Sequence, residues 1–451
     1  MLSFLLFFLP FWFSSTISAR HLALNRRGTS NTNTGHGTGG KDTSSLTTTL
    51  FNTDFDVNIT IGGQIVPVLV DTGSSDTYVM RKSYTCINRT TNAIIPEPSC
   101  LYGQTLYDPE LSPTYHPITD ESFGVLYGAG IASGLMANET VTLAGLTAHD
   151  VKVGIADTST PMGDGLNVGV LGLGYPSLTS AHPGPISDTP NATFYVDRLV
   201  YDPILYKMRD QKLLPDSPTF SIALARTPQN VSAGFGGYLS LGTLPPVRHE
   251  PNFTTVPVEI TSAIPVNFTS GEKVRSYWTL SVSDVRYGRP KTTTSSTPPP
   301  PPGEDASTLE TNKTSFQAFV DSGNYFSYLP GPVVEEINSL FSPPAVYDPT
   351  SQLYVVDCTA TPPQVGVTIG NNTFFHDGRD LIYQVGGDGG NGGGSGGLCV
   401  SSIASADSVA LGGVSISILG VPFMKNVVSV FDIEKNVMGF ARLKGEVTHT
   451  V

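Results

Sequence analysis

Positive charge is scarce and dispersed in this chain of 451 residues. Lys and Arg number 25 against 38 Asp and Glu, which gives a formal net charge of -13. Binding to a phosphate backbone needs clustered Lys and Arg side chains, and the sequence contains no such cluster. Nucleic acid is therefore excluded as an expected partner.

The motifs of several catalytic classes are also missing. No CxxC spacing or nearby His pair offers a zinc site. Four histidines lie apart, without a Ser or Cys nucleophile motif beside them (His116, His149, His249 and His376). The Gly-rich stretch 386–397 lacks the Lys and the helix start of a phosphate-binding loop. We expect neither a metal nor a cofactor.

Long apolar runs are confined to the N-terminus. Residues Leu2 to Phe13 are apolar and small polar residues follow, which is typical of a signal peptide cut near Ser18 or Ala19. The first residues carry no Lys or Arg, and the alternative is a membrane anchor, for which the run is short. The polar end at 444–451 does not suit a lipid-anchor tail. We predict a signal peptide at 1–19 and no stable membrane anchor.

Cysteine is rare, and the four residues present predict two disulfides in an oxidising compartment. Three pairings are possible, of which the sequence-local one, Cys86–Cys100 with Cys358–Cys399, is the simplest. Nine Asn-x-Ser/Thr sequons add support for a glycoprotein that is secreted, either free or associated with a cell wall. They begin at Asn58, Asn88, Asn138, Asn191, Asn230, Asn252, Asn267, Asn312 and Asn371.

The segment 20–49 is predicted to be a short propeptide followed by disordered chain. The dibasic pair Arg26-Arg27 is a plausible processing site, and 28–49 is rich in Thr, Ser, Gly and Asn. Ordered sequence is expected from near Leu50. The alternation from Val57 to Ile61, with Gly62-Gly63 after it, predicts a strand and a hairpin turn.

The remaining chain reads as β-rich with long loops, because Gly, Pro, Ser and Thr separate many short apolar runs. Its length suits two lobes. A segment with five consecutive prolines, 291–307, and the Gly-rich segment 386–397 are predicted to be surface insertions. We place the N-terminal lobe at 50–245 and the C-terminal lobe at 246–451.

A weak internal repeat supports the two lobes. Residues Val68 to Ser74 resemble Ala318 to Asn324, and each segment contains an apolar strand followed by Asp-Thr/Ser-Gly. About a hundred residues after each comes an apolar-apolar-Gly sequence, at 170–172 and at 418–420. A single Asp-Thr-Gly would be an ordinary turn, whereas two with matching partners indicate a duplication.

The repeat places Asp71 and Asp321 at equivalent positions, where two carboxyl groups can meet at the floor of a cleft. Two close carboxyl groups share one proton and titrate jointly. The ionised one can take a proton from water while the protonated one hydrogen-bonds a scissile carbonyl. The glycines permit a sharp turn, and the hydroxyls of Thr72 and Ser322 can hydrogen-bond across a symmetric junction.

Several motifs follow one another along the chain. They are Val70-Asp71-Thr72-Gly73-Ser74-Ser75, Tyr127-Gly128-Ala129-Gly130, Val170-Leu171-Gly172-Leu173-Gly174, Val320-Asp321-Ser322-Gly323, Ile418-Leu419-Gly420 and the final strands at 430–441. In this order they resemble the motifs of the pepsin-like aspartic proteases, and look most like those of the secreted fungal members, from about 51 to 443.

The resemblance implies a mainly β, bilobal fold with an active-site cleft between two related lobes. It implies a monomeric aspartic endopeptidase that acts on polypeptides, at acidic pH, with Asp71 and Asp321 as catalytic residues. Thr72, Gly73, Ser74, Ser322, Gly323 and Asn324 would support the pair. A flap hairpin would carry Tyr127, Gly128 and Ala129, and Tyr78 stands where the family usually has the Trp that partners the flap tyrosine. The sequence-local cysteine pairing also agrees with the family.

Two departures from the family pattern stand out. Asn324 replaces the usual Thr or Ser, so an amide would donate to Asp321 where Ser74 offers a hydroxyl to Asp71, and we hypothesise an altered pKa or a reduced rate. The segment His21 to Arg27 offers little to cover the dyad, so a zymogen of this chain would be activated by another protease at Arg26-Arg27. The alternative functions are a catalytically weakened pepsin-like binding protein and a structural cell-surface glycoprotein, which would leave the repeat unexplained.

Overall fold

A computed structural model describes residues 42–449 except 51, 185–197, 216–217, 228–230, 232, 262–271, 290–308, 386–397 and 410–414. The expected signal peptide, the Arg26-Arg27 pair, both expected insertions and the sequons at Asn191, Asn230 and Asn267 lie outside the described residues. No helix within the described ranges is long and apolar enough to cross a membrane.

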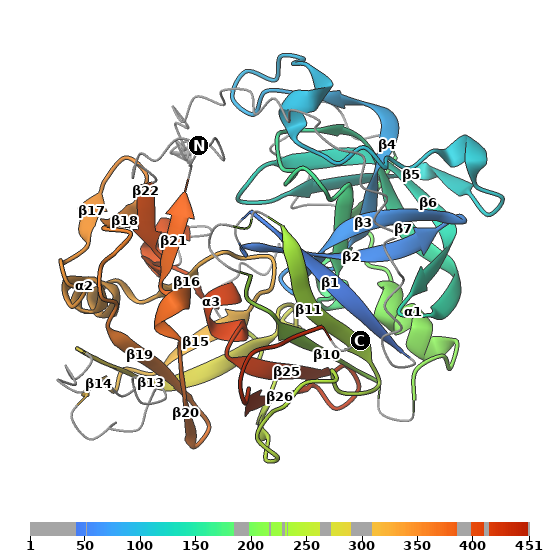
Figure 1. The fold of residues 1–451 in the computed structure, drawn as a ribbon. Coiled ribbons are helices and arrows are strands. Elements are labelled where there is room, and N and C mark those ends of the chain that lie inside the picture. The colour runs from blue at the N-terminus through green and yellow to red at the C-terminus, as the bar shows by residue number, and fades with distance from the viewer. Residues whose placement is uncertain are drawn as a thin grey trace, which may run out of the picture.

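The described strands form three sheets, of which the largest has fourteen strands and joins both halves of the chain (Figure 1). In spatial order they are β12 (Thr254–Pro257), β26 (Val437–Arg442), β25 (Val427–Asp432), β10 (Thr219–Leu224), β11 (Gly234–Leu241), β1 (Thr43–Thr49), β2 (Asp54–Ile61), β3 (Gln64–Asp71), β8 (Gly169–Gly172), β4 (Thr77–Cys86), β7 (Leu146–Ser159), β6 (Ile131–Leu143), β5 (His116–Leu126) and β9 (Ala181–Pro183).

The other two sheets belong to the second half. One has eight strands: β20 (Asn372–Phe375), β19 (Gln364–Ile369), β13 (Thr279–Gly288), β15 (Phe316–Val320), β24 (Ser417–Leu419), β16 (Ser327–Leu329) and β23 (Ile403–Ser405), with β14 (Glu310–Asn312) beside β13. The other has β17 (Val346–Asp348), β18 (Leu353–Val356), β22 (Leu398–Ser401) and β21 (Ile382–Val385). The mainly β class is confirmed.

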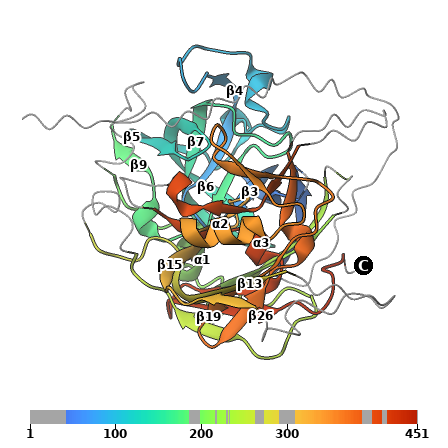
Figure 2. The same cartoon turned by 90° about the vertical axis from the view of Figure 1, so that its left-hand side faces the viewer.

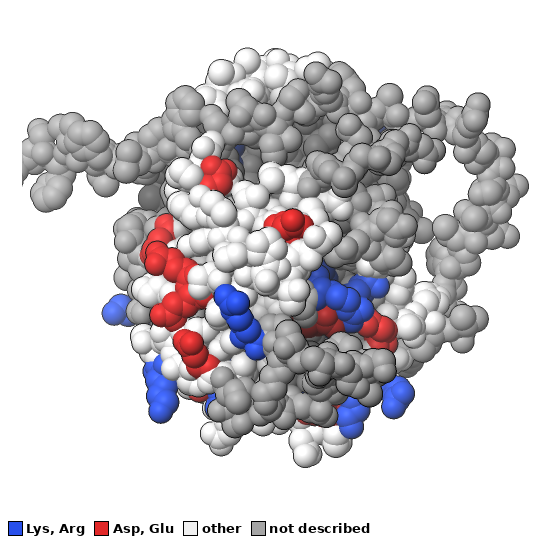
Figure 3. All heavy atoms as spheres, turned by 60° about the vertical axis from the view of Figure 1, so that its left-hand side comes forward, with Lys and Arg blue, Asp and Glu red and all other residues white. Residues whose placement is uncertain are grey.

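The described helices are short and lie outside the sheets. They are α1 (Ile204–Asp210), α2 (Gly331–Ser339) and α3 (Val421–Met424), with 3₁₀ turns η1 (Glu97–Cys100), η2 (Pro109–Leu111), η3 (Pro176–Leu178), η6 (Gly378–Asp380) and η7 (Ala406–Val409). Figure 2 shows α2 and α3 on the side of the molecule formed by the second half. On the face drawn in Figure 3, the described Lys and Arg side chains are interspersed with Asp and Glu.

The expectation of disorder up to residue 49 is wrong for Thr43–Thr49. This segment forms β1, which pairs with β11 on one side and with β2 on the other. Its sequence, TSSLTTT, has a single large apolar side chain, Leu46, and so lacks the alternation that marks a strand. The hydrogen bonds of two neighbouring strands, rather than an apolar face, hold it in the sheet.

The predicted hairpin at Gly62-Gly63 is confirmed, because β2 and β3 pair antiparallel up to Ile61 and Gln64. Both glycines have a positive φ, of 54° and 81°, which a two-residue turn of this kind requires. The predicted boundary at 245/246 is crossed by a sheet, because β10 pairs with β25 from the end of the chain.

The internal repeat corresponds to one local arrangement that occurs twice. In the first half β3 runs parallel to β8, with Asp71 opposite Gly172. In the second half β15 runs parallel to β24, with Val320 opposite Leu419, and the Asp321 amide donates to the Leu419 carbonyl at 3.1 Å. Each Asp therefore lies at the carboxyl end of a buried strand that a second parallel strand supports.

Two disulfides link Cys86 to Cys100 and Cys358 to Cys399, which confirms the sequence-local pairing. They close loops whose ends are 14 and 41 residues apart in sequence. Of the six sequons within the described ranges, those at Asn58, Asn252 and Asn371 are exposed. The asparagines at 88, 138 and 312 are half-buried.

Trp278 connects the two halves of the core. Its indole Nε1 donates to the Leu173 carbonyl at 2.9 Å, and its ring lies 4.8 Å from Tyr175, 5.6 Å from Phe220 and 5.0 Å from Phe431, measured between centroids. The side chain is fully buried. Removal of so large a group leaves a cavity that the neighbouring rings cannot fill.

We expect Trp278→Ala to lower the free energy of unfolding by about 3–5 kcal/mol. The measurement is urea unfolding followed by far-UV circular dichroism. Trp278→Phe, which keeps an aromatic ring but not the indole donor, should lose less. Equal stability of Trp278→Ala and the parent protein would contradict this account of the core.

Candidate active site

The loops that follow β3 and β15 face each other, and hydroxyl groups bond them crosswise. The Thr72 hydroxyl donates to the Val320 carbonyl at 2.9 Å, and the Ser322 hydroxyl donates to the Val70 carbonyl at 2.7 Å. Each hydroxyl also accepts the other residue's backbone amide, at 2.9 Å from Ser322 and at 3.1 Å from Thr72. These four bonds fix the two loops against each other with approximate two-fold symmetry.

The two carboxyl groups lie in contact above this junction. The amides of Gly73 and Gly323 donate to Oδ1 of Asp71 and of Asp321, at 2.8 and 2.9 Å. A Cβ on Gly73 would lie 2.5 Å from Cγ of Asp321, and one on Gly323 would lie 2.6 Å from Oδ1 of Asp71. Only glycine fits at either position, because each loop passes directly beside the carboxyl group of the other.

The two sides differ in their third residue. The Ser74 hydroxyl donates to Oδ2 of Asp71. On the other side the side chain of Asn324 hydrogen-bonds Asp321 and lowers its pKa, while Oδ1 of Asn324 accepts from the Phe326 amide at 3.3 Å. The amide of Asn324 thus stands in for the hydroxyl that the family pattern leads one to expect.

The environment separates the pKa values of the two carboxyl groups. Burial raises the pKa of Asp71, and hydrogen bonds from Ser74 and Gly73 oppose this rise. At Asp321 burial and then the negative charge of Asp71 raise the pKa well above its usual range. Two carboxyl groups in contact in such a setting cannot both ionise easily, so they titrate jointly.

A hairpin made by β5 and β6 reaches toward the pair. Its tip is closed by a bond of 2.8 Å from the Tyr127 amide to the Gly130 carbonyl, and Gly128 and Ala129 are exposed at the apex. The Tyr127 ring stacks on Tyr78 with 6.5 Å between centroids. Burial raises the pKa of Tyr127, and the charge of Asp71 is the next largest cause. The predicted flap residues therefore lie together, close to Asp71.

Comparison with known proteins identifies the family. A family model described as eukaryotic aspartyl protease matches residues 55–443. The chain belongs to this family. This aspartyl protease is accordingly a peptide hydrolase.

This aspartyl protease has relatives among fungi and among animals. A probable aspartic-type endopeptidase of Aspergillus fumigatus is 34% identical over 388 residues, which cover 86% of this chain and 78% of the relative. Aspartic protease 1 of Caenorhabditis elegans is 27% identical, with coverage of 85% and 81%. The crystal structure of an aspartic proteinase from Irpex lacteus aligns with a TM-score of 0.59 and 20% identity, over 89% of this chain and 97% of the other, which shows a shared fold.

The described part of this aspartyl protease holds no group of three His, Cys, Asp or Glu side chains arranged for a metal ion. It does hold buried acids that sequence reasoning missed. Asp54 and Asp56 are both buried on β2 and lie near Asp164. Tyr325, two residues after Gly323, donates to Oδ2 of Asp54 at 3.4 Å. The one sequence signal for this cluster is the alternation of residues along β2, which places the two acids on the same face of the strand. That alternation does not reveal that the acids are buried, because Phe55 between them is buried as well.

The cluster makes stability depend on pH. Burial and the charge of Asp164 raise the pKa of Asp54 from 3.8 to about 7. Below pH 3.8 the carboxyl is protonated in both the folded and the unfolded state. As the pH rises toward 7 only the unfolded state releases its proton, so the folded state loses stability through this window.

We therefore expect the free energy of unfolding of Asp54→Asn to fall less between pH 4 and pH 7.5 than that of the parent protein. At pH 7.5 the free energy of unfolding of Asp54→Asn should exceed that of the parent protein by about 2–4 kcal/mol. Urea unfolding at both pH values measures it, and Asp120→Asn, at an exposed position, is the control. The same pH slope for Asp54→Asn and the parent protein would refute the assignment.

Proposed function

We propose that this chain is a secreted aspartic endopeptidase, active at acidic pH, in which Asp71 and Asp321 activate a water molecule. The observation that carries the proposal is the contact of two buried carboxyl groups, each beside the glycine of the opposite loop. Such a pair keeps one proton and one negative charge in the same place, which is what general acid–base hydrolysis of an amide needs.

The asymmetry of the pair assigns the roles. Asp71, whose charge is supported by Ser74 and Gly73, is the base that takes a proton from the water. Asp321, whose pKa is raised well above its usual range, donates a hydrogen bond to the carbonyl oxygen of the scissile bond. Attack of the water oxygen on the carbonyl carbon gives a tetrahedral intermediate. The proton held by Asp71 then passes to the leaving nitrogen as the C–N bond breaks.

The hairpin of β5 and β6 is proposed as the flap that closes over the bound peptide. Gly128 lies at its apex and Gly130 directly after the apex, and Tyr127 extends from it to the neighbourhood of Asp71. Closure over the peptide would exclude water other than the reacting molecule. The binding-protein alternative has little support, because Asn324, its one sequence argument, hydrogen-bonds Asp321 as a working donor would.

Secretion is proposed from the signal-like N-terminus and the two disulfides, which suit an oxidising compartment outside the cytosol. Processing at Arg26-Arg27 would leave β1 in the mature chain, because β1 begins at Thr43. N-terminal sequencing of protein from the culture medium tests both points. A start within β1 or downstream of it would contradict the proposed processing.

The dyad is tested by cleavage of denatured haemoglobin or casein between pH 2 and pH 7, with and without the transition-state mimic pepstatin. Asp71→Asn should lower kcat by at least about 10³-fold, because the general base is lost. Urea unfolding of the variant shows that it is folded. Cleavage that survives both pepstatin and Asp71→Asn would refute the dyad. No cleavage by folded, processed protein would favour the binding-protein alternative.

Asn324 provides a test of the acid partner. Its hydrogen bond lowers the pKa of Asp321, so Asn324→Ala should raise that pKa and move the alkaline limb of the kcat/KM profile to higher pH. Asn324→Thr keeps a donor, so it should move the limb less than Asn324→Ala does. An alkaline limb unmoved in Asn324→Ala would show that Asn324 does not tune the dyad.

A further inference from the structure

One contact near the flap lies outside the family motifs described above. Arg89, in the loop closed by the Cys86–Cys100 disulfide, reaches the apex of the β5–β6 hairpin. Its Nη1 donates to the Gly128 carbonyl at 2.7 Å and to the Ala129 carbonyl at 3.0 Å. A single guanidinium nitrogen therefore holds two consecutive carbonyl groups of the flap tip.

The loop that carries Arg89 is well anchored. Ile87 pairs with Ile94 as an isolated antiparallel bridge, and the Ile87 amide donates to the Ser159 carbonyl at 2.9 Å. Between these positions Oδ1 of Asn88 accepts the amides of Thr90 and Thr91, at 2.9 and 3.0 Å. The turn around Arg89 is thus fixed by its own hydrogen bonds and by the disulfide.

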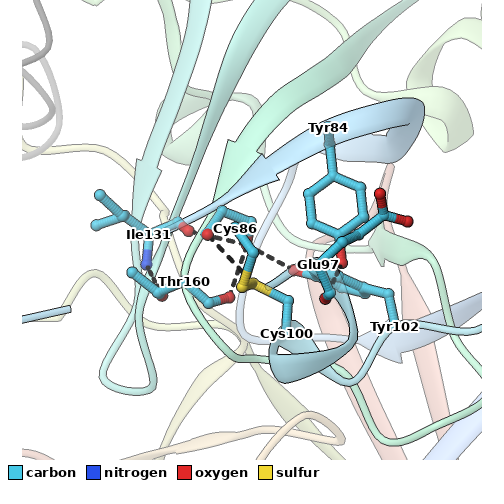
Figure 4. The surroundings of a disulfide bond; sticks show 8 residues. Tyr84, Cys86, Glu97, Cys100, Tyr102, Ile131 and Thr160 are labelled. Carbon is cyan, nitrogen blue, oxygen red and sulfur yellow. Dashed lines mark hydrogen bonds between the residues drawn. A yellow bond between two sulfur atoms is a disulfide. The ribbon is translucent and has the colours of Figure 1, made fainter. Parts of the chain in front are cut away.

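The disulfide of this loop also lies beside the base of the flap. Figure 4 shows the Cys86–Cys100 bridge beside Ile131 and Thr160. The Ile131 amide donates to the Thr160 hydroxyl at 3.0 Å, and a Cβ on Gly130 would lie 1.9 Å from that hydroxyl oxygen. The base of the tip is therefore held by β7 and the chain after it, whereas the apex is held by Arg89.

We propose that Arg89 is a positioning residue that tethers the flap tip to the disulfide loop and favours the flap conformation in which Tyr127 stacks on Tyr78. Any movement of the apex away from the loop must break both bonds to Nη1 together. Charge-assisted bonds to two carbonyls are stronger than neutral ones, although exposure of Arg89 to solvent moderates them. The proposal rests on the proposed function only in calling this hairpin the flap.

The experiment compares Arg89→Ala, Arg89→Lys and a matched control by hydrogen–deuterium exchange of peptides covering 125–132, and by steady-state kinetics on a peptide substrate. Arg89→Ala should speed exchange of this segment about 3- to 10-fold and lower kcat/KM by a similar factor, mostly through KM. Arg89→Lys keeps one donor nitrogen, so its exchange rate and its kcat/KM should lie between those of Arg89→Ala and those of the parent protein. Arg89→Ala also preserves the Asn88 sequon, so the glycosylation of the variants can be matched.

The control is Arg442→Ala on β26. Arg442 is also exposed and also donates to a backbone carbonyl, that of Thr373 at 2.5 Å, but it lies in the second half. The Arg442→Ala variant should leave hydrogen–deuterium exchange of the segment 125–132 unchanged. Unchanged exchange at 125–132 in Arg89→Ala would overturn the tether whatever the activity. Absence of proteolysis by the parent protein would overturn the proposed function alone, because the exchange measurement needs no substrate.

Discussion

Two carboxyl groups in contact, away from bulk water, are the constraint on which this structure depends. Such groups repel when both are charged and are costly to bury when either is. The crosswise bonds of Thr72 and Ser322 resist the separation that repulsion would cause. Each hydroxyl binds the strand of the opposite half, so the position of one carboxyl group cannot change without moving the other. The parallel strands β8 and β24 support this junction from both halves.

The same physical chemistry extends beyond the pair. Asp54 and Asp56 are buried near Asp164, and Asp76 is buried with bonds from the Tyr201 hydroxyl at 2.7 Å and the Ser180 amide at 2.8 Å. Burial raises the pKa of Asp54, Asp56 and Asp76. At a pH below these raised pKa values the three carboxyl groups are protonated in the folded state, so the packing around them then contains no charge that is costly to bury.

Sequence reasoning reached the strands, the turn at Gly62-Gly63, both disulfides and the meeting of Asp71 with Asp321, because each leaves a local pattern or a repeated one. It missed β1, whose place depends on neighbours about 200 residues away in sequence, such as Ser240 opposite Thr43. It also missed the bond from Tyr325 to Asp54 and that from Arg89 to the flap. Each joins a loop residue to a partner that lies elsewhere in the sequence, and no periodicity in a single sequence encodes such a contact.

The order of strands in the large sheet has a consequence for how the chain is made. β10 pairs with β25, with Thr219 opposite Asp432, and β12 pairs with β26. Strands synthesised midway along the chain can therefore complete their pairing only after the C-terminal strands have been made. Until then β10 has one open edge on which a strand of another molecule could add. Long-range pairing of this kind is slow and exposes intermediates to aggregation. Substitutions in β25 or β26 would therefore reduce the yield of folded protein well before they altered the activity of the molecules that do fold.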